Sequence, residues 1–244
     1  MTRLLVVLVL VFALVSTAHA QLDQLLKQFP QIPGTGQTPL PGSLGEVKIG
    51  QALKEALQVG TENAVKLTGK TDGYFANQAI KILLPERLKS LESGLRLVGY
   101  GPQVDELVLG MNRAAEQAAP AAKQIFFDSI GEMSIDDAHK ILDGPQTAAT
   151  DYFKSKTTGQ LTTAFQPIVE KSMGQVGVTR QYEDLLGRAK SIPFLNVEQF
   201  DLNHYVVGKS LDGLFYMVGE EEKKIRTNPS ARVTDLLKEV FGRR

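Results

Sequence analysis

The sequence of 244 residues contains no cysteine, no tryptophan and only three histidines. Without cysteine the chain forms neither a disulfide nor a thiolate metal site, and it offers no thiol for a lipid anchor. His139 and His204 lie far apart and outside the H-E-x-x-H pattern, whereas zinc usually takes three or four protein ligands. We therefore expect no metal ion and no other cofactor.

Signatures of the common catalytic sites are also missing. Residues 208–213 do not have the spacing of the G-x-S-x-G elbow. They contain Gly-Lys-Ser, the end of a phosphate-binding loop, but Asn203 stands where that motif requires its first glycine. The acidic residues of 136–143 lack the alternating ligands and the central glycine of a calcium loop, and helix capping accounts for them. No catalytic residue is predicted.

Neither sign of charge dominates, since 27 basic residues face 27 acidic ones. A balanced chain lacks the basic surface with which proteins bind nucleic acid, so nucleic acid is not an expected partner. After residue 20 no stretch approaches the 18 consecutive apolar residues that indicate a membrane-spanning helix. No transmembrane segment is therefore predicted in the mature chain.

Residues 1–20 have the pattern of a cleavable secretion signal. Arg3 is followed by the apolar stretch Leu4–Val15, and Ala18-His19-Ala20 is a small-x-small cleavage site. The apolar stretch is too short to cross a hydrocarbon core of roughly 30 Å as a permanent anchor. We expect cleavage between Ala20 and Gln21, and a bacterial protein that is periplasmic or secreted.

The mature chain is expected to begin with a short amphipathic segment at residues 21–28. Prolines and glycines then recur up to Gly42, which is typical of a linker. The sequence thus predicts three parts, which are a signal peptide at 1–20, the amphipathic segment and Pro/Gly linker at 21–42, and a helical domain at 43–244.

Apolar residues at three- and four-residue steps predict helices through most of this domain. Such faces recur at residues 49–67, 104–118, 135–142, 207–218 and 233–241. Ser134 is placed to cap the third of these helices and Gly144 to end it. The expected fold class is all-α, a multi-helix, bundle-like single domain.

Three local features qualify this pattern. Residues 79–84 alternate briefly, which predicts either one short strand or an extended lead-in to the next helix. Pro120 and Pro167 fall inside helical patterns and are expected to kink or divide those helices. Several glycines lie in or near apolar faces, where close helix contacts or flexibility would explain them; among them are Gly50, Gly174, Gly208 and Gly213.

One candidate binding cluster lies at residues 111–116. Asn112 and Glu116 are four residues apart, so they share a helix face and are candidates to pair with each other or with a partner. In the functional interpretation, Arg113 or Glu116 meets a ligand in a buried polar pocket. The structural interpretation, an ion pair that ties this helix to a neighbour, is the commoner one for buried charges.

A second candidate lies in the charged run 220–226. Glu220 with Lys224 and Glu222 with Arg226 have the favourable spacing for helix ion pairs, and such a run is normally a solvated face. Arg226 and Arg232 are alternatively placed to clamp an acidic group, because guanidinium forks suit carboxylates.

Several segments resemble one bacterial family, catalogued as domain of unknown function 4197. They are M-N-R-A-A-E at 111–116, A-A-T-D-Y-F at 148–153, L-D-G-L-F at 211–215, the stretch E-E-x-K-K-I-R-T-N-P-S-A-R from 220, and L-L-K-E-V-F-G at 236–242. The likeness covers about residues 44–242 and implies an exported, largely helical domain. It implies no activity and carries over no catalytic residue. Some relatives resemble lipoproteins, a pattern from which this cysteine-free chain departs.

The leading hypothesis is a non-enzymatic periplasmic binding or scaffolding module for an unidentified envelope ligand or protein. One alternative is a hydrolase without a familiar motif that uses carboxylates such as Glu116, Asp151 or Glu221, since paired carboxylates need no histidine or cysteine. Another is peripheral association with a membrane through residues 21–28. The sequence leaves the oligomeric state and the pathway open.

Overall fold

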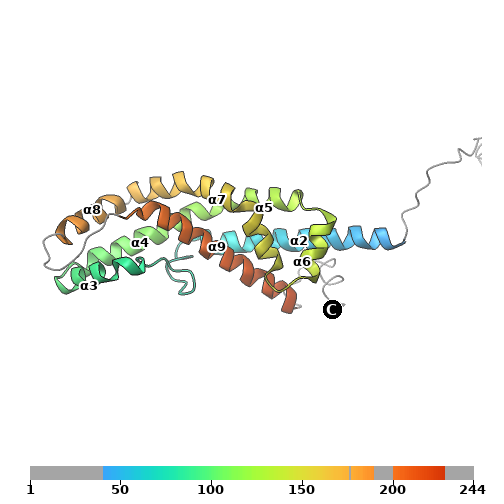
Figure 1. The fold of residues 1–244 in the computed structure, drawn as a ribbon, viewed down its shortest axis with the longest axis horizontal. Helices are drawn as coiled ribbons and strands as arrows, with labels where there is room; N and C mark the ends of the chain where they lie inside the picture. The colour runs from blue at the N-terminus through green and yellow to red at the C-terminus, as the bar shows by residue number, and fades with distance from the viewer. Residues whose placement is uncertain (1–40, 176, 190–199, 229–244) are drawn as a thin grey trace, which may run out of the picture. The chain divides into compact units, whose positions relative to one another are not determined.

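The structure, a computed structural model, describes residues 41–175, 177–189 and 200–228. These residues form helices and connecting segments, and none of them forms a strand (Figure 1). By its internal contacts the chain divides into Met1–Pro41 and Gly42–Arg244, and the second unit holds the described helices. The fold is an all-α single domain, which confirms the fold class that the apolar spacing predicts.

The described helices follow one another along the chain. Their bounds are α2 Pro41–Gly69, the 3₁₀ helix η1 Glu86–Leu88, α3 Lys89–Leu97, α4 Gly101–Ala118, the 3₁₀ helix η2 Ala119–Ala121, α5 Ala122–Gly131, α6 Ile135–Asp143, α7 Ala148–Gln175, α8 Val178–Ala189 and α9 Leu202–Thr227. The predicted helix at 233–241 lies outside the described residues.

The core centres on α7 and α9, which lie side by side (Figure 1). The apolar face predicted at 207–218 is the buried face of α9. Phe126 of α5 packs edge-to-face against Phe153 of α7 and Phe215 of α9, with ring centroids 5.1 and 6.2 Å apart. Such aromatic pairs stabilise a core beyond the area that they bury.

Of the two prolines, only Pro120 interrupts a helix. It lies in η2, which separates α4 from α5, so the expected division is confirmed there. Pro167 lies inside α7, so of the two expected effects, a kink or a division, the division does not occur at this position. Pro167 and Thr163, whose carbonyl loses its i+4 donor, are both exposed, so water can replace the missing hydrogen bond.

The start of α6 follows the sequence signals closely. The Ser134 hydroxyl accepts a hydrogen bond from the Asp137 N–H at 3.0 Å, and the Ser134 N–H donates to Asp137 Oδ2 at 3.2 Å. This reciprocal capping box satisfies amides that a helix start leaves unpaired. The hydrogen bonds from Ser134 hold the pKa of Asp137 below its ordinary value. Gly144 follows the last helical residue, as predicted.

Among the glycines singled out from the sequence, Gly213 marks a close approach. A Cβ atom at this position would lie 2.6 Å from Cε1 of the Tyr74 ring and 3.1 Å from Cβ of Ile80. No heavy atom of another part of the fold lies within 4 Å of such a Cβ at Gly50, Gly174 or Gly208. Close packing of α9 against the turns that contain Tyr74 and Ile80, rather than contact between two helices, therefore explains Gly213, and no close contact explains the other three.

Segment 79–84 forms no strand. Residues 78–80 make a turn, and 81–85 then lead without helix or strand into η1. Of the two interpretations of this segment, the lead-in to a helix is confirmed. Ile80, Ile82 and Leu84 are buried, while Leu83 is exposed, so the alternation reflects packing against the helices.

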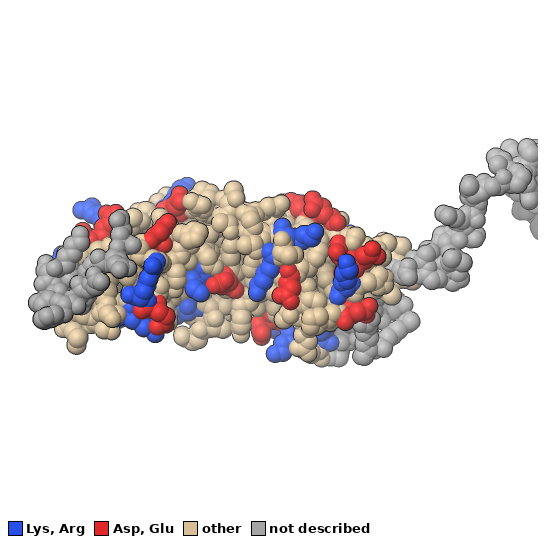
Figure 2. All heavy atoms as spheres, viewed as in Figure 1, with Lys and Arg blue, Asp and Glu red and all other residues tan. Residues whose placement is uncertain are grey.

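On the face drawn in Figure 2, Lys and Arg side chains are interspersed with Asp and Glu, and neither sign covers a large continuous area. This agrees with the balanced composition. Among the described residues, no helix is both long enough and apolar enough to cross a membrane.

Candidate functional site

The candidate Asn112 is fully buried in α4 and bonds only to the protein itself. Its Oδ1 accepts from the Ile82 N–H at 2.8 Å, and its Nδ2 donates to Ile82 O at 2.8 Å and to Val108 O at 2.7 Å. The amide therefore satisfies the backbone of the segment that lies against α4. It does not bond to Glu116, its expected partner on the same face.

Glu116 is also buried, one turn further along α4. Its Oε1 accepts from the N–H groups of Tyr74 and Phe75, both at 3.1 Å, and its Oε2 accepts from Arg113 at 2.6 Å. Arg113 in turn donates to Asp72 Oδ1 at 2.7 Å. The arrangement ties α4 to the segment after α2, which is the geometry of the structural ion pair rather than of an open pocket. The hydrogen bond that Arg113 donates to Glu116 is the main reason that the pKa of Arg113 is raised.

Tyr74 extends this buried polar cluster to α9. Its hydroxyl donates to Ser210 O at 2.6 Å, and the side chain is fully buried. Burial raises the pKa of Tyr74 far above its ordinary value, and the negative charge of Glu116 adds to the shift. Tyr74 therefore stays neutral and links the 70–75 segment to α9.

The charged run 220–226 is not a solvated face, and this prediction was wrong. Glu221 and Glu222 are only 6% and 7% exposed. Glu222 accepts hydrogen bonds from the N–H groups of Ala149 and Thr150 at 3.0 and 2.9 Å, and so caps the start of α7. A carboxylate is favoured at a helix N-terminus because the backbone N–H groups there are unpaired and the helix dipole is positive.

Of the two ion pairs predicted within this run, one is confirmed and the other is wrong. Arg226 bonds Glu222 at 3.0 Å, as predicted, and also donates to Ile141 O at 2.6 Å. Lys224 pairs with Glu221 at 2.6 Å and not with Glu220. The proposed clamp of Arg226 with Arg232 stays a prediction, because Arg232 lies outside the described residues. The predicted cleavage site at Ala20 and Gln21 lies outside them too.

The three carboxylates considered for a hydrolase have separate surroundings. Glu116 is bound as described above, and Glu221 accepts from Lys224 and from Asn63 at 3.2 Å. Asp151 is exposed and accepts from the Thr147 hydroxyl at 3.1 Å. Within the described part of the chain, no group of three or more His, Asp or Glu side chains has the arrangement of a metal site.

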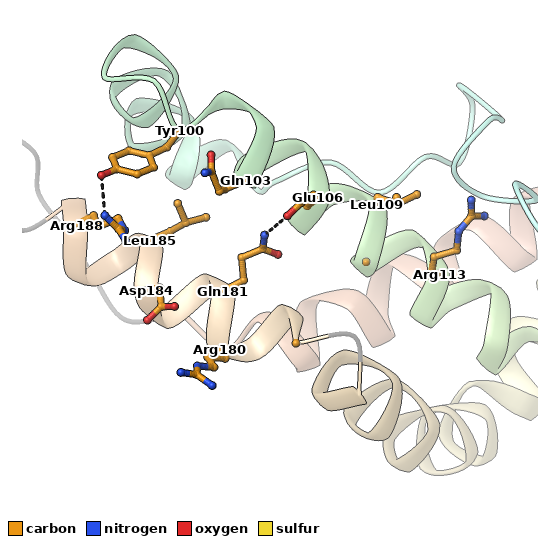
Figure 3. Close-up of a pocket in the computed structure, with 12 residues that line it drawn as sticks. Tyr100, Gln103, Glu106, Leu109, Arg113, Arg180, Gln181, Asp184, Leu185 and Arg188 are labelled. Carbon is orange, nitrogen blue, oxygen red and sulfur yellow. Dashed lines mark hydrogen bonds between the residues drawn. The ribbon is translucent and has the colours of Figure 1, made fainter.

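The structure adds a cleft that the sequence did not indicate. It has a volume of about 540 Å³ and lies between α4 and α8 (Figure 3). Its wall on α4 includes Gln103, Glu106 and Leu109, and Tyr100 lies just before this helix. The wall on α8 includes Gln181, Leu185 and Arg188. Arg113 lines one end, so one of the residues singled out from the sequence borders the cleft.

Two polar contacts cross this cleft. Gln181 Nε2 donates to Glu106 Oε2 at 2.8 Å, and Arg188 Nη1 donates to the Tyr100 hydroxyl at 2.7 Å. Because residue 106 meets 181 and residue 100 meets 188, the two helices run antiparallel here. Figure 3 shows Gln103 and Leu185 between the two contacts, whereas Arg180 and Asp184 point away from α4.

Comparison with known protein families gives a match over most of the chain. The family described as "Protein of unknown function (DUF4197)" matches residues 43–242. The chain belongs to this family. Neither a curated protein nor a solved structure matches it.

Membership in the DUF4197 family confirms the resemblance noted from the sequence segments. The match includes both helices of the cleft and the buried carboxylates Glu116, Glu221 and Glu222. The description of the DUF4197 family names no activity, so any assignment of function depends on the chemistry of the side chains.

No single sequence signal identified the cleft. Gln103, Glu106 and Gln181 stand among other polar residues, and each is typical of a solvated helix surface. Only the packing of α8 against α4, which are about 75 residues apart in the chain, places them opposite one another.

Proposed function

We propose that this chain is an exported, non-enzymatic binding module that holds a small ligand between α4 and α8. The observation that carries the proposal is the cleft itself, of about 540 Å³, within the range of roughly 300–1,000 Å³ common for ligand pockets. Polar and apolar groups face it from both helices. Binding sites typically combine an apolar wall with a few polar groups that orient the ligand.

The contacts that Glu116 and Glu221 make within the protein support a binding function over hydrolysis. A hydrolase of the kind considered from the sequence needs two carboxylates that face a substrate across an open site. Glu116 and Glu221 are instead buried in ion pairs and hydrogen bonds with the protein itself. Removing them from these contacts would leave buried charges unpaired, which is costly.

The predicted secretion signal also supports the proposal. Residues 1–20 have the pattern of a cleavable signal peptide, which favours a periplasmic or secreted protein whose ligand would be an extracytoplasmic solute.

A thermal-unfolding screen tests the proposal. The exported chain is melted, with circular dichroism at 222 nm, in the presence of single compounds that include short peptides, sugars, organic acids and phospholipids. Gln103→Trp fills the cleft from an exposed position, and Gln160→Trp, an exposed position on α7, is the matched control. Compounds that raise Tm should lose this effect in Gln103→Trp and keep it in Gln160→Trp.

Two outcomes would overturn the proposal. In the first, no compound stabilises the chain, or the stabilising compounds act equally on Gln103→Trp. In the second, mass spectrometry of the stabilising compounds after incubation shows conversion that depends on the chain, which would make the protein an enzyme.

A further inference from the structure

The two contacts that cross the cleft leave hydrogen-bonding capacity unused. Among the residues that the structure describes, Glu106 has a partner at Oε2 only, so its other carboxylate oxygen is open to a donor. Within the described residues, Arg188 donates through Nη1 only, which leaves its Nε and Nη2 groups open to an acceptor. The Gln103 side chain makes no hydrogen bond within the described part of the chain, and it lies between the other two.

The open groups of the two contacts carry opposite charges. Arg188 provides a guanidinium at the end of the cleft farthest from Arg113, and Glu106 provides a carboxylate near its middle. Arg113 adds little positive charge, because Glu116 and Asp72 already pair with it. Arg180 and Asp184 also line the cleft, but they point away from α4 (Figure 3). Glu106 and Arg188 are therefore the charged groups of the two contacts that a ligand lying between the helices would meet.

The helices fix the separation of these two groups. Tyr100 and Glu106 are six residues apart on α4, and Gln181 and Arg188 are seven apart on α8, which corresponds to about 9–10 Å along each helix axis. The charges of a free amino acid lie too close together to reach both Glu106 and Arg188. An extended peptide advances about 3.3–3.6 Å per residue, so two or three residues cover this distance.

We propose that the cleft binds a short peptide of two or three residues with free ends, the terminal carboxylate at Arg188 and the terminal ammonium at Glu106. The side-chain amides of Gln103 and Gln181 have the donors and acceptors that peptide groups need. Leu109, which is half-buried, provides an apolar wall for the peptide side chains. This assignment rests on the proposed function, since it names the ligand of the same cleft.

Isothermal titration of the exported chain with four probes tests the assignment. The probes are trialanine, N-acetyl-trialanine, trialanine amide and free alanine. Each blocked peptide loses one charged contact with an exposed partner, so its affinity should fall about three- to fivefold. Free alanine should bind more weakly still.

Variants that remove one charge from the cleft identify which end of the peptide binds at Arg188 and which binds at Glu106. Arg188→Gln should bind trialanine and its amide equally, while it still distinguishes the N-acetyl form. Glu106→Gln should show the opposite pattern. Lys123→Gln removes an exposed ion pair with Glu62, away from the cleft, and should behave like the wild type. Equal binding of blocked and free peptides by the wild type, or equal discrimination by all variants, would overturn the assignment.

The results also distinguish a failure of the peptide assignment from a failure of the proposed binding function. If trialanine does not bind while another compound acts through the cleft, the peptide assignment fails and the binding module stands. If no compound acts through the cleft, both fail.

Discussion

The side-chain amide of Asn112 exchanges hydrogen bonds with both backbone groups of Ile82, each at 2.8 Å. In this way a helix side chain supplies the pairing that a neighbouring strand gives in a sheet. Segment 81–85 has neither helix nor strand, and Ile82 is nevertheless buried with its N–H and C=O satisfied. This contact holds the segment against α4, as Glu116 holds the backbone at Tyr74 and Phe75.

The first prediction concerns this pair. Asn112→Ala leaves the N–H and C=O of Ile82 unpaired in the core, so it should lower the free energy of unfolding by about 2–4 kcal/mol. Urea unfolding followed at 222 nm measures the loss. Gln160→Ala, at an exposed position without a side-chain hydrogen bond, should stay within about 0.5 kcal/mol of the wild type. A similar effect of the two substitutions would contradict the role given to Asn112.

The second prediction concerns Glu222, which caps α7 and pairs with Arg226. Glu222→Ala leaves the N–H groups of Ala149 and Thr150 unpaired and removes a partner of a mostly buried guanidinium, so it should cost about 3–5 kcal/mol. Glu220→Ala is the matched control two residues away, because Glu220 makes no hydrogen bond or ion pair within the described residues. Chemical denaturation should rank the two variants clearly; equal stability would mean that the run 220–226 is a solvated face after all.

The third prediction concerns pH. The pKa of Asp137 is lowered in the folded protein by its hydrogen bonds with Ser134, so the ionised carboxylate stabilises α6. This contribution is complete above the ordinary aspartate pKa of about 3.9 and is lost as the pH falls through the lowered value. Asp137→Asn should therefore lower Tm at pH 7, and the difference from the wild type should shrink below pH 4.

A double substitution checks the cause of that effect. In a Ser134→Ala background, most of the loss of Tm that Asp137→Asn causes at pH 7 should disappear. If the loss persists at full size, the capping box is not its source.

The fourth prediction compares two glycines of α9. Gly213→Ala places a Cβ 2.6 Å from the Tyr74 ring, so it should destabilise the fold by about 1–3 kcal/mol. Gly208→Ala meets nothing within 4 Å and removes a flexible residue from a helix interior, so it should stabilise the fold by about 0.5–1 kcal/mol. Thermal unfolding should show changes in Tm of opposite sign for the two variants. A gain in Tm for Gly213→Ala would contradict the close approach of Gly213 to Tyr74.

The fifth prediction concerns export. Intact-mass measurement of the protein recovered from the cell envelope should give a chain that begins at Gln21. Ala20→Lys disrupts the small-x-small site and should delay cleavage. Recovery of a chain that still carries Met1 would contradict the predicted signal peptide.

Local signals in the sequence predicted the parts of the fold that depend on neighbouring residues. Ser134 and Gly144 bound α6 because capping is decided within one helical turn. The division at Pro120 and the buried face of α9 follow from chemistry that is equally local. The family match rests on such short segments as well.

The long-range contacts could not be predicted in this way. Glu222 has the spacing of a surface ion pair with Arg226, and its burial depends on α7, whose first residues are more than 70 positions earlier. The cleft depends likewise on α8 meeting α4. Glu106 and Gln181 carry no sequence feature that distinguishes them from solvated neighbours.

The most direct test of the binding function is an amide ¹H–¹⁵N spectrum of the chain without its predicted signal peptide, recorded with and without a compound that raises its Tm. The account predicts that the largest shifts fall within residues 100–113 and 177–188, on the two walls of the cleft, and that Gln103→Trp abolishes them. Shifts centred elsewhere, or unchanged in Gln103→Trp, would contradict it.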